Sequence, residues 1–236
     1  MSERPLTPPP PSQLGTKDYW QNIYSTDTNI YATRPESPTS QGQIWFSESL
    51  AEERLTQFLQ EDLCLPDSST FLDLGCGNGH LLFYLRDEGF EEGRMLGVDY
   101  VPEAIELAKK IAANEDREDV EFSVWDCVGG NYEDVLDEEE GKKKEWDVVL
   151  DKGTFDAIGL AEDGRQAEQG YLERAKKLVR KDGLVVITSC NWTEEELIEK
   201  FTKGGELVVE GKVNYPTFQF GGKQGQTIST IAFKRV

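Results

Sequence analysis

The sequence predicts an α/β fold in which a mostly parallel sheet is covered by helices on both faces. Short apolar strands alternate with amphipathic helices along most of the chain, a pattern typical of parallel sheets. A glycine-rich turn follows the first buried strand directly. Aspartates stand at or near the carboxyl ends of successive predicted strands, which is where ligands bind in open α/β sheets.

The individual strands and helices can be placed in order. Strands are expected at Phe71–Leu74, Arg94–Val98, Glu121–Val124, Asp147–Leu150, Leu184–Thr188, Leu207–Val213 and Gln226–Phe233. Helices are expected at Leu81–Glu88, Pro102–Asn114, Gln166–Arg180 and Thr193–Phe201. Pro102 suits a first helical turn, and Thr193 with Glu196 forms a capping box. Only the turn-rich segment Asn214 to Gly225 separates the last two strands, so they should pair as an antiparallel hairpin at one edge.

The remaining segments flank or interrupt this core. Two helices, Asp18–Tyr24 and Ser47–Gln60, should form an N-terminal lid (residues 14–66) over the ligand end of the seven-stranded core (residues 67–236), within a single domain. Half of the ten prolines lie in the first eleven residues, so residues 1–13 should be a disordered tail; the PPPP run could also dock a proline-reading domain. Glu133 to Glu145 is nearly all charged and reads as a solvated loop.

Composition narrows the class of partner. The 236 residues carry 45 acidic and 25 basic side chains, a net charge of −20. This charge argues against a nucleic-acid substrate. It favours a basic partner or a small molecule, or it serves only solubility. The sequence has neither an apolar run long enough for a membrane helix nor a secretory signal, and its four cysteines form no CxxC pair. We therefore expect a cytoplasmic protein, a monomer, without a metal centre.

The glycine-rich turn indicates the type of ligand. Phe71 to Gly79 reads FLDLGCGNG, and its glycines let the backbone approach a ligand and expose N–H groups at a helix start. A dinucleotide site has the spacing GxGxxG, but the third of those positions is His80. Asp73, two residues before the first glycine, disfavours a pyrophosphate and suits an ammonium group. S-adenosylmethionine carries an ammonium and a carboxylate that the turn can meet.

Further acids extend this predicted crevice. Asp99, 20 residues after Gly79, stands where an acid binds both ribose hydroxyls, and Asp126 can reach an adenine amino group. Each acid alone could instead be a turn-former or a helix cap. The candidate cofactor-binding residues are Asp73, Gly75, Cys76, Gly77, Asn78, Gly79, Asp99, Tyr100, Asp126, Cys127 and Asp151.

From Phe71 to Val236 the chain resembles the class I, seven-stranded, S-adenosylmethionine-dependent methyltransferases, whose first motif is (D/E)xGxGxG. The resemblance implies a Rossmann-like sheet with strand order 3-2-1-4-5-7-6 and the last strand antiparallel. Five motifs look closer still: LGTKDYW (Leu14–Trp20), GQIWF (Gly42–Phe46), DKGTFDAI (Asp151–Ile158), ITSCNWTEEEL (Ile187–Leu197) and FQFGGKQG (Phe218–Gly225). They resemble the lysine methyltransferases of translation elongation factor 1-alpha of fungi and animals. The resemblance implies methylation of a lysine ε-amine on that basic factor in the cytosol.

Some segments depart from this resemblance. They are the proline tail, the acidic Glu133–Glu145 segment and the stretch Asn29–Gln41. None of them touches a motif, so they put only regulation or docking in doubt.

Roles for the acceptor side follow from the fourth strand. Enzymes that methylate planar amines carry (N/D)PP(Y/F) there, whereas this chain continues from Asp151 as DKGTFD. We predict that Asp151, with Asp156, orients the incoming ammonium and helps it lose a proton. The alternatives are a turn-fixing hydrogen bond for Asp151 and helix-start capping for Asp156. The single histidine, His80, is expected to be structural.

Aromatic residues are candidates for the walls of the acceptor channel. Trp45, Phe46 and Trp192 could line a lysine channel, or they could belong to the core. Three other readings of the sequence remain open: a methyltransferase of small molecules, a non-catalytic binding protein that uses this fold, and a nucleic-acid methyltransferase. The last is disfavoured by charge and by the missing (N/D)PP(Y/F).

Overall fold

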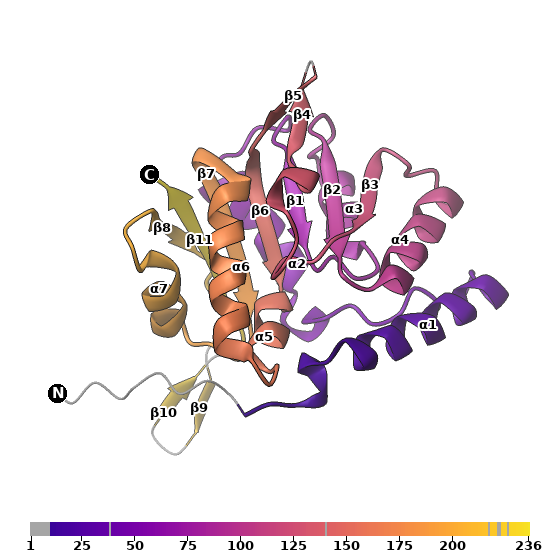
Figure 1. Ribbon diagram of the computed structural model, residues 1–236, viewed down its shortest axis with the longest axis horizontal. Helices are drawn as coiled ribbons and strands as arrows, with labels where there is room; N and C mark the ends of the chain where they lie inside the picture. Colours follow the sequence, from indigo (N-terminus) through magenta and orange to yellow (C-terminus); the bar gives the residue numbers. More distant parts are fainter. Residues whose placement is uncertain (1–9, 38, 140, 217, 221–222, 226) are drawn as a thin grey trace.

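A computed structural model describes residues 10–37, 39–139, 141–216, 218–220, 223–225 and 227–236. Its centre is a seven-stranded sheet in the order β3-β2-β1-β6-β7-β11-β8 (Figure 1). These strands are β1 (Phe71–Leu74), β2 (Met95–Asp99), β3 (Val120–Val124), β6 (Trp146–Lys152), β7 (Val179–Ser189), β8 (Leu207–Lys212) and β11 (Ser229–Arg235). The pairs among β3, β2, β1, β6 and β7 are parallel, and β11 runs antiparallel to β7 and β8. The predicted order 3-2-1-4-5-7-6 is confirmed.

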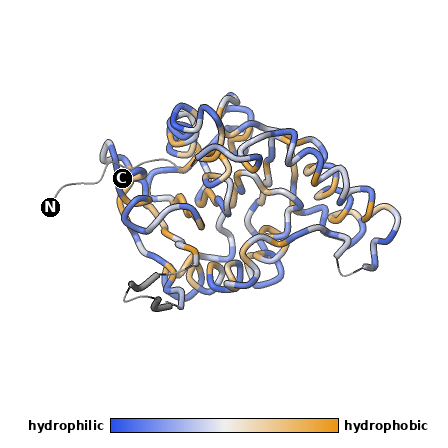
Figure 2. The backbone as a smooth tube through the Cα atoms, turned by 90° about the horizontal axis from the view of Figure 1, so that it is seen from below, coloured by the Kyte–Doolittle hydropathy of each residue, from blue (hydrophilic) through white to orange (hydrophobic). Residues whose placement is uncertain are grey.

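Helices cover both faces of the sheet, as predicted. One face packs against α2 (Ala51–Gln57), α3 (His80–Asp87) and α4 (Pro102–Asn114), and the other against α5 (Thr154–Gly159), α6 (Gly164–Leu178) and α7 (Glu194–Thr202). Side chains of a strand alternate between faces, so Phe71 of β1 joins the first core while Leu72 and Leu74 join the second. Figure 2 shows the resulting alternation of hydrophobic and hydrophilic stretches along the chain.

Several predicted bounds need adjustment. The helix expected to end at Arg180 stops at Leu178, and β7 begins at the next residue and contains the whole predicted strand Leu184–Thr188. The short helix α5 was not predicted. The capping box is confirmed, because the Thr193 hydroxyl accepts from Glu196 N and the Glu196 carboxylate accepts from Thr193 N.

The segment Glu133 to Glu145 is not a solvated loop. A short helical turn, Tyr132–Val135, is followed by the hairpin of β4 (Asp137–Glu139) and β5 (Lys142–Lys144). The three acids of β4 lie opposite the three lysines of β5, and opposite charges on paired strands attract each other. The Asp137 carboxylate is only 2% exposed and pairs with Arg94 at 3.1 Å. Glu138, Lys142 and Lys143 stay exposed, so the segment is solvated as expected but forms a hairpin and not a loop.

The N-terminal lid differs in extent from the prediction. After the turn Gln13–Gly15, α1 runs over Lys17–Thr33, well beyond the predicted end at Tyr24. It extends because Thr28 and Tyr31 are buried and the helix packs along α4. In Figure 1, α1 lies at the end of the sheet toward which β6 points, which agrees with a lid over the ligand end.

The second predicted lid helix, Ser47–Gln60, is broken into three. Phe46 and Leu50 have φ of 65° and 53°, so a short turn, Ser47–Ser49, precedes α2, and a π-helical turn, Phe58–Asp62, follows it. A second hairpin, β9 (Phe218–Phe220) with β10 (Lys223–Gly225), occupies the turn-rich segment before β11. Most of the predicted proline tail (residues 1–9) and Gln226 lie outside the described residues. No described helix is both long and apolar enough to span a bilayer.

Candidate cofactor and acceptor site

The glycine-rich turn joins β1 to α3 as predicted. Gly75, Gly77 and Gly79 have φ of 73°, 55° and 82°, which residues with a Cβ adopt only with strain. Gly75 N and Cys76 N both donate to Val98 O, at 2.7 and 2.9 Å. The turn is thereby tied to β2, directly beneath the ends of the two strands that bear Asp73 and Asp99.

Asp73 presents a buried carboxylate to the crevice. Asp73 is only 3% exposed. No described residue donates a hydrogen bond to its carboxylate. Burial raises the pKa of Asp73 to about 8, against the opposing effect of the nearby Lys152 cation. A buried carboxylate without a partner is costly, and a ligand ammonium removes that cost. The residue therefore fits the cationic end of S-adenosylmethionine.

Asp99, the last residue of β2, lies on the other side of the turn. Its Oδ2 accepts from Gly77 N at 3.2 Å and its Oδ1 from Val101 N at 2.9 Å. Burial raises the pKa of Asp99 to about 6, although these backbone donors favour the charged form. Next to it, the Tyr100 ring carries the Lys17 ammonium 5.2 Å from its centroid. The Asp99 carboxylate is thus held in place by two backbone amides, and its predicted contact with the ribose hydroxyls stays a prediction.

The remaining predicted cofactor residues lie at the rim of this crevice. Asp126 is exposed, two residues beyond β3, and its Oδ1 accepts from Val128 N at 2.8 Å. Burial raises the pKa of the Cys127 thiol well above its usual value, with further contributions from Asp151, Asp126 and Asp99. The structure therefore brings Asp73, Asp99 and Asp151 close enough for the charges of Asp151 and Asp99 to raise the pKa of Asp73, and the exposed Asp126 acts with Asp151 and Asp99 on Cys127.

Asp151 is engaged by the protein itself. It is 2% exposed and accepts hydrogen bonds from Thr154 N at 2.9 Å, Phe155 N at 2.9 Å and the Tyr171 hydroxyl at 2.7 Å. Burial raises its pKa to about 7, while the Tyr171 hydrogen bond opposes this rise. The carboxylate holds the loop after β6 and the first turn of α5. Tyr171 lies 20 residues away on α6, and no local pattern in the sequence links the two.

Asp156 is also used within the fold. Its carboxylate accepts from the Ser189 hydroxyl and from Cys190 N, the latter at 2.8 Å. It joins α5 to the end of β7 and does not cap the start of α5, where the amides of Thr154 and Phe155 go to Asp151.

Charged residues that the sequence left without a function adjoin this crevice. His80 Nδ1 lies 2.7 Å from Glu52 Oε2, and Lys152 Nζ lies 3.5 Å from Glu52 Oε1. Although burial opposes it, the His80 hydrogen bond and the Lys152 charge hold the pKa of Glu52 below its usual value. His80 has the structural contact expected of it. The charge of Lys152 also lowers the pKa of Asp73 and so opposes the effect of burial there.

Aromatic residues of the lid cover the turn. Trp20 and Tyr24 are stacked with centroids 6.3 Å apart, and Trp45 lies 5.5 Å from Trp20 and 6.4 Å from Phe46. The Tyr24 hydroxyl lies so close to Gly77 that a Cβ there would collide with it. Trp20 and Tyr24 belong to the predicted lid helix Asp18–Tyr24 but were not singled out as site residues, although their spacing of four residues places them on one helix face.

Trp192 does not join the other two predicted channel residues. It is 4% exposed and packs in the core on the α6 and α7 face, 6.1 Å from Phe155. Phe46, by contrast, packs against the core of the opposite face.

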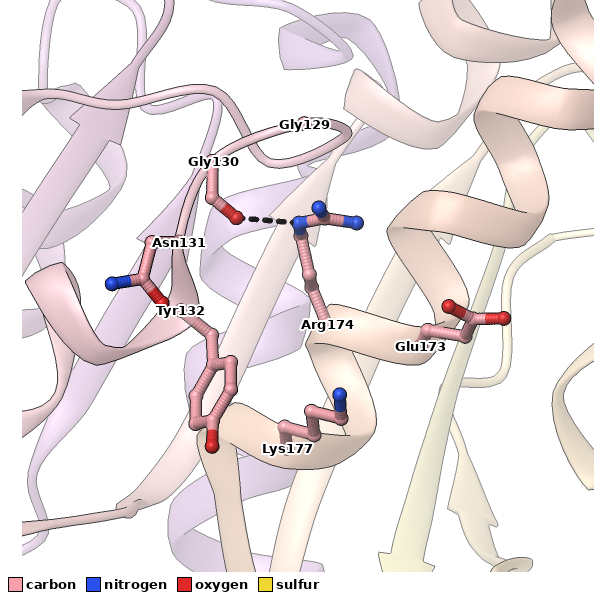
Figure 3. A pocket seen from close by; sticks show the side chains of 7 residues that line it. All are labelled: Gly129, Gly130, Asn131, Tyr132, Glu173, Arg174 and Lys177. Atoms are coloured by element: carbon pink, nitrogen blue, oxygen red, sulfur yellow. Dashed lines mark hydrogen bonds between the residues drawn. The ribbon is translucent and has the colours of Figure 1, made fainter.

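A larger cavity lies away from these groups. It has a volume of about 250 Å³ between the loop after β3 and α6 (Figure 3). There Arg174 Nε donates to Gly130 O at 2.7 Å. None of the four strand-end aspartates lines it, so its size alone does not make it the ligand site.

Known proteins resemble the chain over nearly its whole length. Residues 65–231 match the methyltransferase domain family. The chain is 39% identical to the protein-lysine N-methyltransferase efm4 of Schizosaccharomyces pombe, over 95% of each chain. It is 32% identical to the EEF1A lysine methyltransferase 2 of Homo sapiens, over 96% of this chain and 88% of that protein. The chain belongs to this family of protein-lysine N-methyltransferases.

Solved structures of methyltransferases share the family fold. Magnesium protoporphyrin IX methyltransferase from Synechocystis PCC 6803, with bound SAM, superposes with a TM-score of 0.60 at 14% identity, over 93% of this chain and 95% of that one. At 14% sequence identity, the similarity shows a shared fold and nothing about the substrate. The cofactor of this lysine methyltransferase is S-adenosylmethionine, in agreement with its methyltransferase domain and with the Asp73 carboxylate, for which the described part of the chain provides no hydrogen-bond donor.

Proposed function

We propose that this lysine methyltransferase transfers a methyl group from S-adenosylmethionine to a lysine ε-amine of translation elongation factor 1-alpha. The observation that carries the proposal is the extent of similarity. The methyltransferase domain match covers residues 65–231, whereas the relatives named EEF1A lysine methyltransferase 2 align over 95–96% of the chain at 32–35% identity. Two relatives named protein-lysine N-methyltransferase align over 94–95% of it at 35–39% identity. The likeness thus includes the N-terminal lid, which a shared cofactor alone does not require.

The chain's own residues divide the work of binding between two ends of the cofactor. In the proposal, Asp73 holds the ammonium, the amides of the turn Gly75–Gly79 meet the carboxylate, and Asp99 binds the ribose hydroxyls. Tyr100, Asp126 and Cys127 surround the base. When bound, S-adenosylmethionine supplies an electrophilic methyl group on a sulfonium.

The acceptor must be neutral to attack. For a lysine with a pKa near 10.4, deprotonation at pH 7 costs about 4–5 kcal/mol of free energy. Entry into a dry site lowers that cost, because desolvation disfavours the charged amine. Both oxygens of Asp151 accept hydrogen bonds from backbone amides or from the Tyr171 hydroxyl. We therefore assign to Asp151 the role of holding the loop after β6 in place. The orientation of the ammonium by Asp151 and Asp156, predicted from the sequence, remains to be tested.

The charge of the protein supports a basic protein substrate. A net charge of −20 attracts a basic partner over distances of about a Debye length and raises the association rate. We further infer that the enzyme acts in the cytoplasm as a monomer, which cell fractionation and sedimentation would test.

The decisive experiment is incubation of the protein with isotopically labelled S-adenosylmethionine and purified elongation factor 1-alpha, followed by mass spectrometry of the factor's lysines. We expect label on a lysine with the wild type and a large loss with Asp73→Asn. A parallel incubation with the small-molecule fraction of a lysate provides the alternative acceptor. Label in that fraction and none in protein would favour a small-molecule methyltransferase. Tight cofactor binding without transfer to any acceptor would favour a non-catalytic protein.

A further inference from the structure

A small cavity opens between the lid and the glycine-rich turn. It has a volume of about 30 Å³, and the residues that line it include Tyr19, Trp20, Tyr24, Asp27, Trp45 and Asn78. Asn78 belongs to the turn itself, and Asn78 Nδ2 donates to Gln41 O at 2.8 Å. The cavity is therefore lined by the cofactor turn as well as by α1 and the segment that leads to Trp45.

The walls of this cavity have the chemistry of a cation site. Trp20 stacks with Tyr24 and lies edge-on to Trp45, and aromatic faces attract ammonium groups. Beside them stands Asp27, whose Oδ2 lies 2.6 Å from the position a Cβ would take on Gly42. Among the described residues no hydrogen bond or ion pair to the Asp27 carboxylate is found. Burial raises the pKa of Asp27 above its usual value, and a cation beside it would reverse that rise.

We infer that the acceptor lysine of the protein substrate enters through this cavity, where Asp27 receives its ammonium and Trp20, Tyr24 and Trp45 line its path to the turn. The inference rests on the proposed function and names the substrate-binding part of that site. Of the three channel residues predicted from the sequence it keeps only Trp45. With a volume of about 30 Å³ and aromatic walls, the cavity has room for one small group such as an ammonium, and it is too small for a planar base.

The test separates acceptor binding from cofactor binding. Asp27→Asn keeps the size of the side chain and removes its charge, and a hydrogen bond to a charged group contributes about 1.5–3 kcal/mol. We expect the KM for elongation factor 1-alpha to rise by roughly 10- to 100-fold, with the Kd for S-adenosylmethionine within twofold of wild type by calorimetry. Glu36→Gln, which removes the same charge from an exposed residue just after α1, is the matched control and should leave both constants unchanged.

A second pair of variants tests the aromatic wall. Trp45→Phe keeps an aromatic face and should retain most activity, whereas Trp45→Leu should raise the KM for the protein substrate. Thermal unfolding of each variant checks that it is folded.

Each failure has a distinct meaning. If the wild type methylates elongation factor 1-alpha and Asp27→Asn has an unchanged KM, the inference is wrong and the proposed function stands. If Asp27→Asn weakens cofactor binding as much as acceptor binding, the cavity belongs to the cofactor and the inference is again wrong. If the wild type methylates no lysine of the factor, the proposed function fails and the inference fails with it.

Discussion

Replacement of Asp73 by asparagine should stabilise the cofactor-free protein while it weakens cofactor binding. The folded-state pKa of about 8 lies above the ordinary 3.8, so this group binds more protons when folded than when unfolded between these values. Its contribution to the free energy of unfolding is full below pH 3.8 and is lost as the pH rises toward 8. Between the unfolded-state pKa of 3.8 and pH 7 there are about 3 pH units, so the free energy of unfolding lost by pH 7 is on the order of 4 kcal/mol.

The asparagine variant removes the charge but leaves a buried amide, which costs about 1–3 kcal/mol when it has no partner. We therefore expect a net gain of roughly 1–3 kcal/mol, which raises the Tm by about 2–4 °C per kcal/mol for a chain of this size. Differential scanning calorimetry of both proteins at pH 6 and pH 8 measures it. The gain should be larger at pH 8, because the wild-type group is mostly protonated in the folded protein at pH 6 and about half charged at pH 8, so the wild type loses stability over this range and the variant does not.

The same variant should bind S-adenosylmethionine at least 10-fold more weakly, since a charge-assisted hydrogen bond to an ammonium contributes about 1.5–3 kcal/mol. Isothermal titration calorimetry gives the Kd. An Asp73→Asn protein that is less stable than wild type at pH 8, or that binds the cofactor with an unchanged Kd, would refute the assignment of this carboxylate to the cofactor ammonium.

Three further outcomes are expected. Because burial raises the pKa of Asp73 to about 8, cofactor binding should release a proton near pH 7. Below pH 7 the affinity for the cofactor should fall by up to about tenfold per pH unit. Calorimetry in two buffers of different ionisation enthalpy measures the proton release. Tyr171→Phe removes a hydrogen bond of 2.7 Å to Asp151 and should lower kcat by loosening the loop after β6, with the cofactor Kd little changed; an equal change in both would contradict this role. Thr193→Ala removes the capping box of α7 and should cost about 1 kcal/mol of unfolding free energy with no change in KM, as urea unfolding and steady-state assays can check.

The core of the fold was predictable because local patterns determine it. The turn FLDLGCGNG can only join a strand to a helix, and Pro102 and Thr193 mark helix starts by their own backbone and side-chain chemistry. Elements set by distant contacts were not predictable. The length of α1 depends on its packing along α4. The hairpin of β4 and β5 depends on pairing between an acidic and a basic strand, whereas the composition of this segment alone predicts a solvated loop.

The site divides in the same way. Parallel strands place their carboxyl ends at one edge, so Asp73, Asp99 and Asp151 could be expected in one crevice. Their partners could not be read from the sequence, because Tyr171, Glu52 and the lid aromatics come from other elements. For Trp192 the sequence left a channel wall and the core open, and the structure places it in the core.

The arrangement of charge links cofactor binding to stability. Burial raises the pKa values of Asp73, Asp99 and Asp151, and the charges of Asp151 and Asp99 add to the rise at Asp73. Lys152 offsets part of this effect but is shared with Glu52. A crevice with an excess of buried negative charge is unfavourable alone and favourable around a ligand that carries both an ammonium and a sulfonium. These acids lower the free energy of unfolding of the cofactor-free protein, and the same acids strengthen the binding of a cationic cofactor.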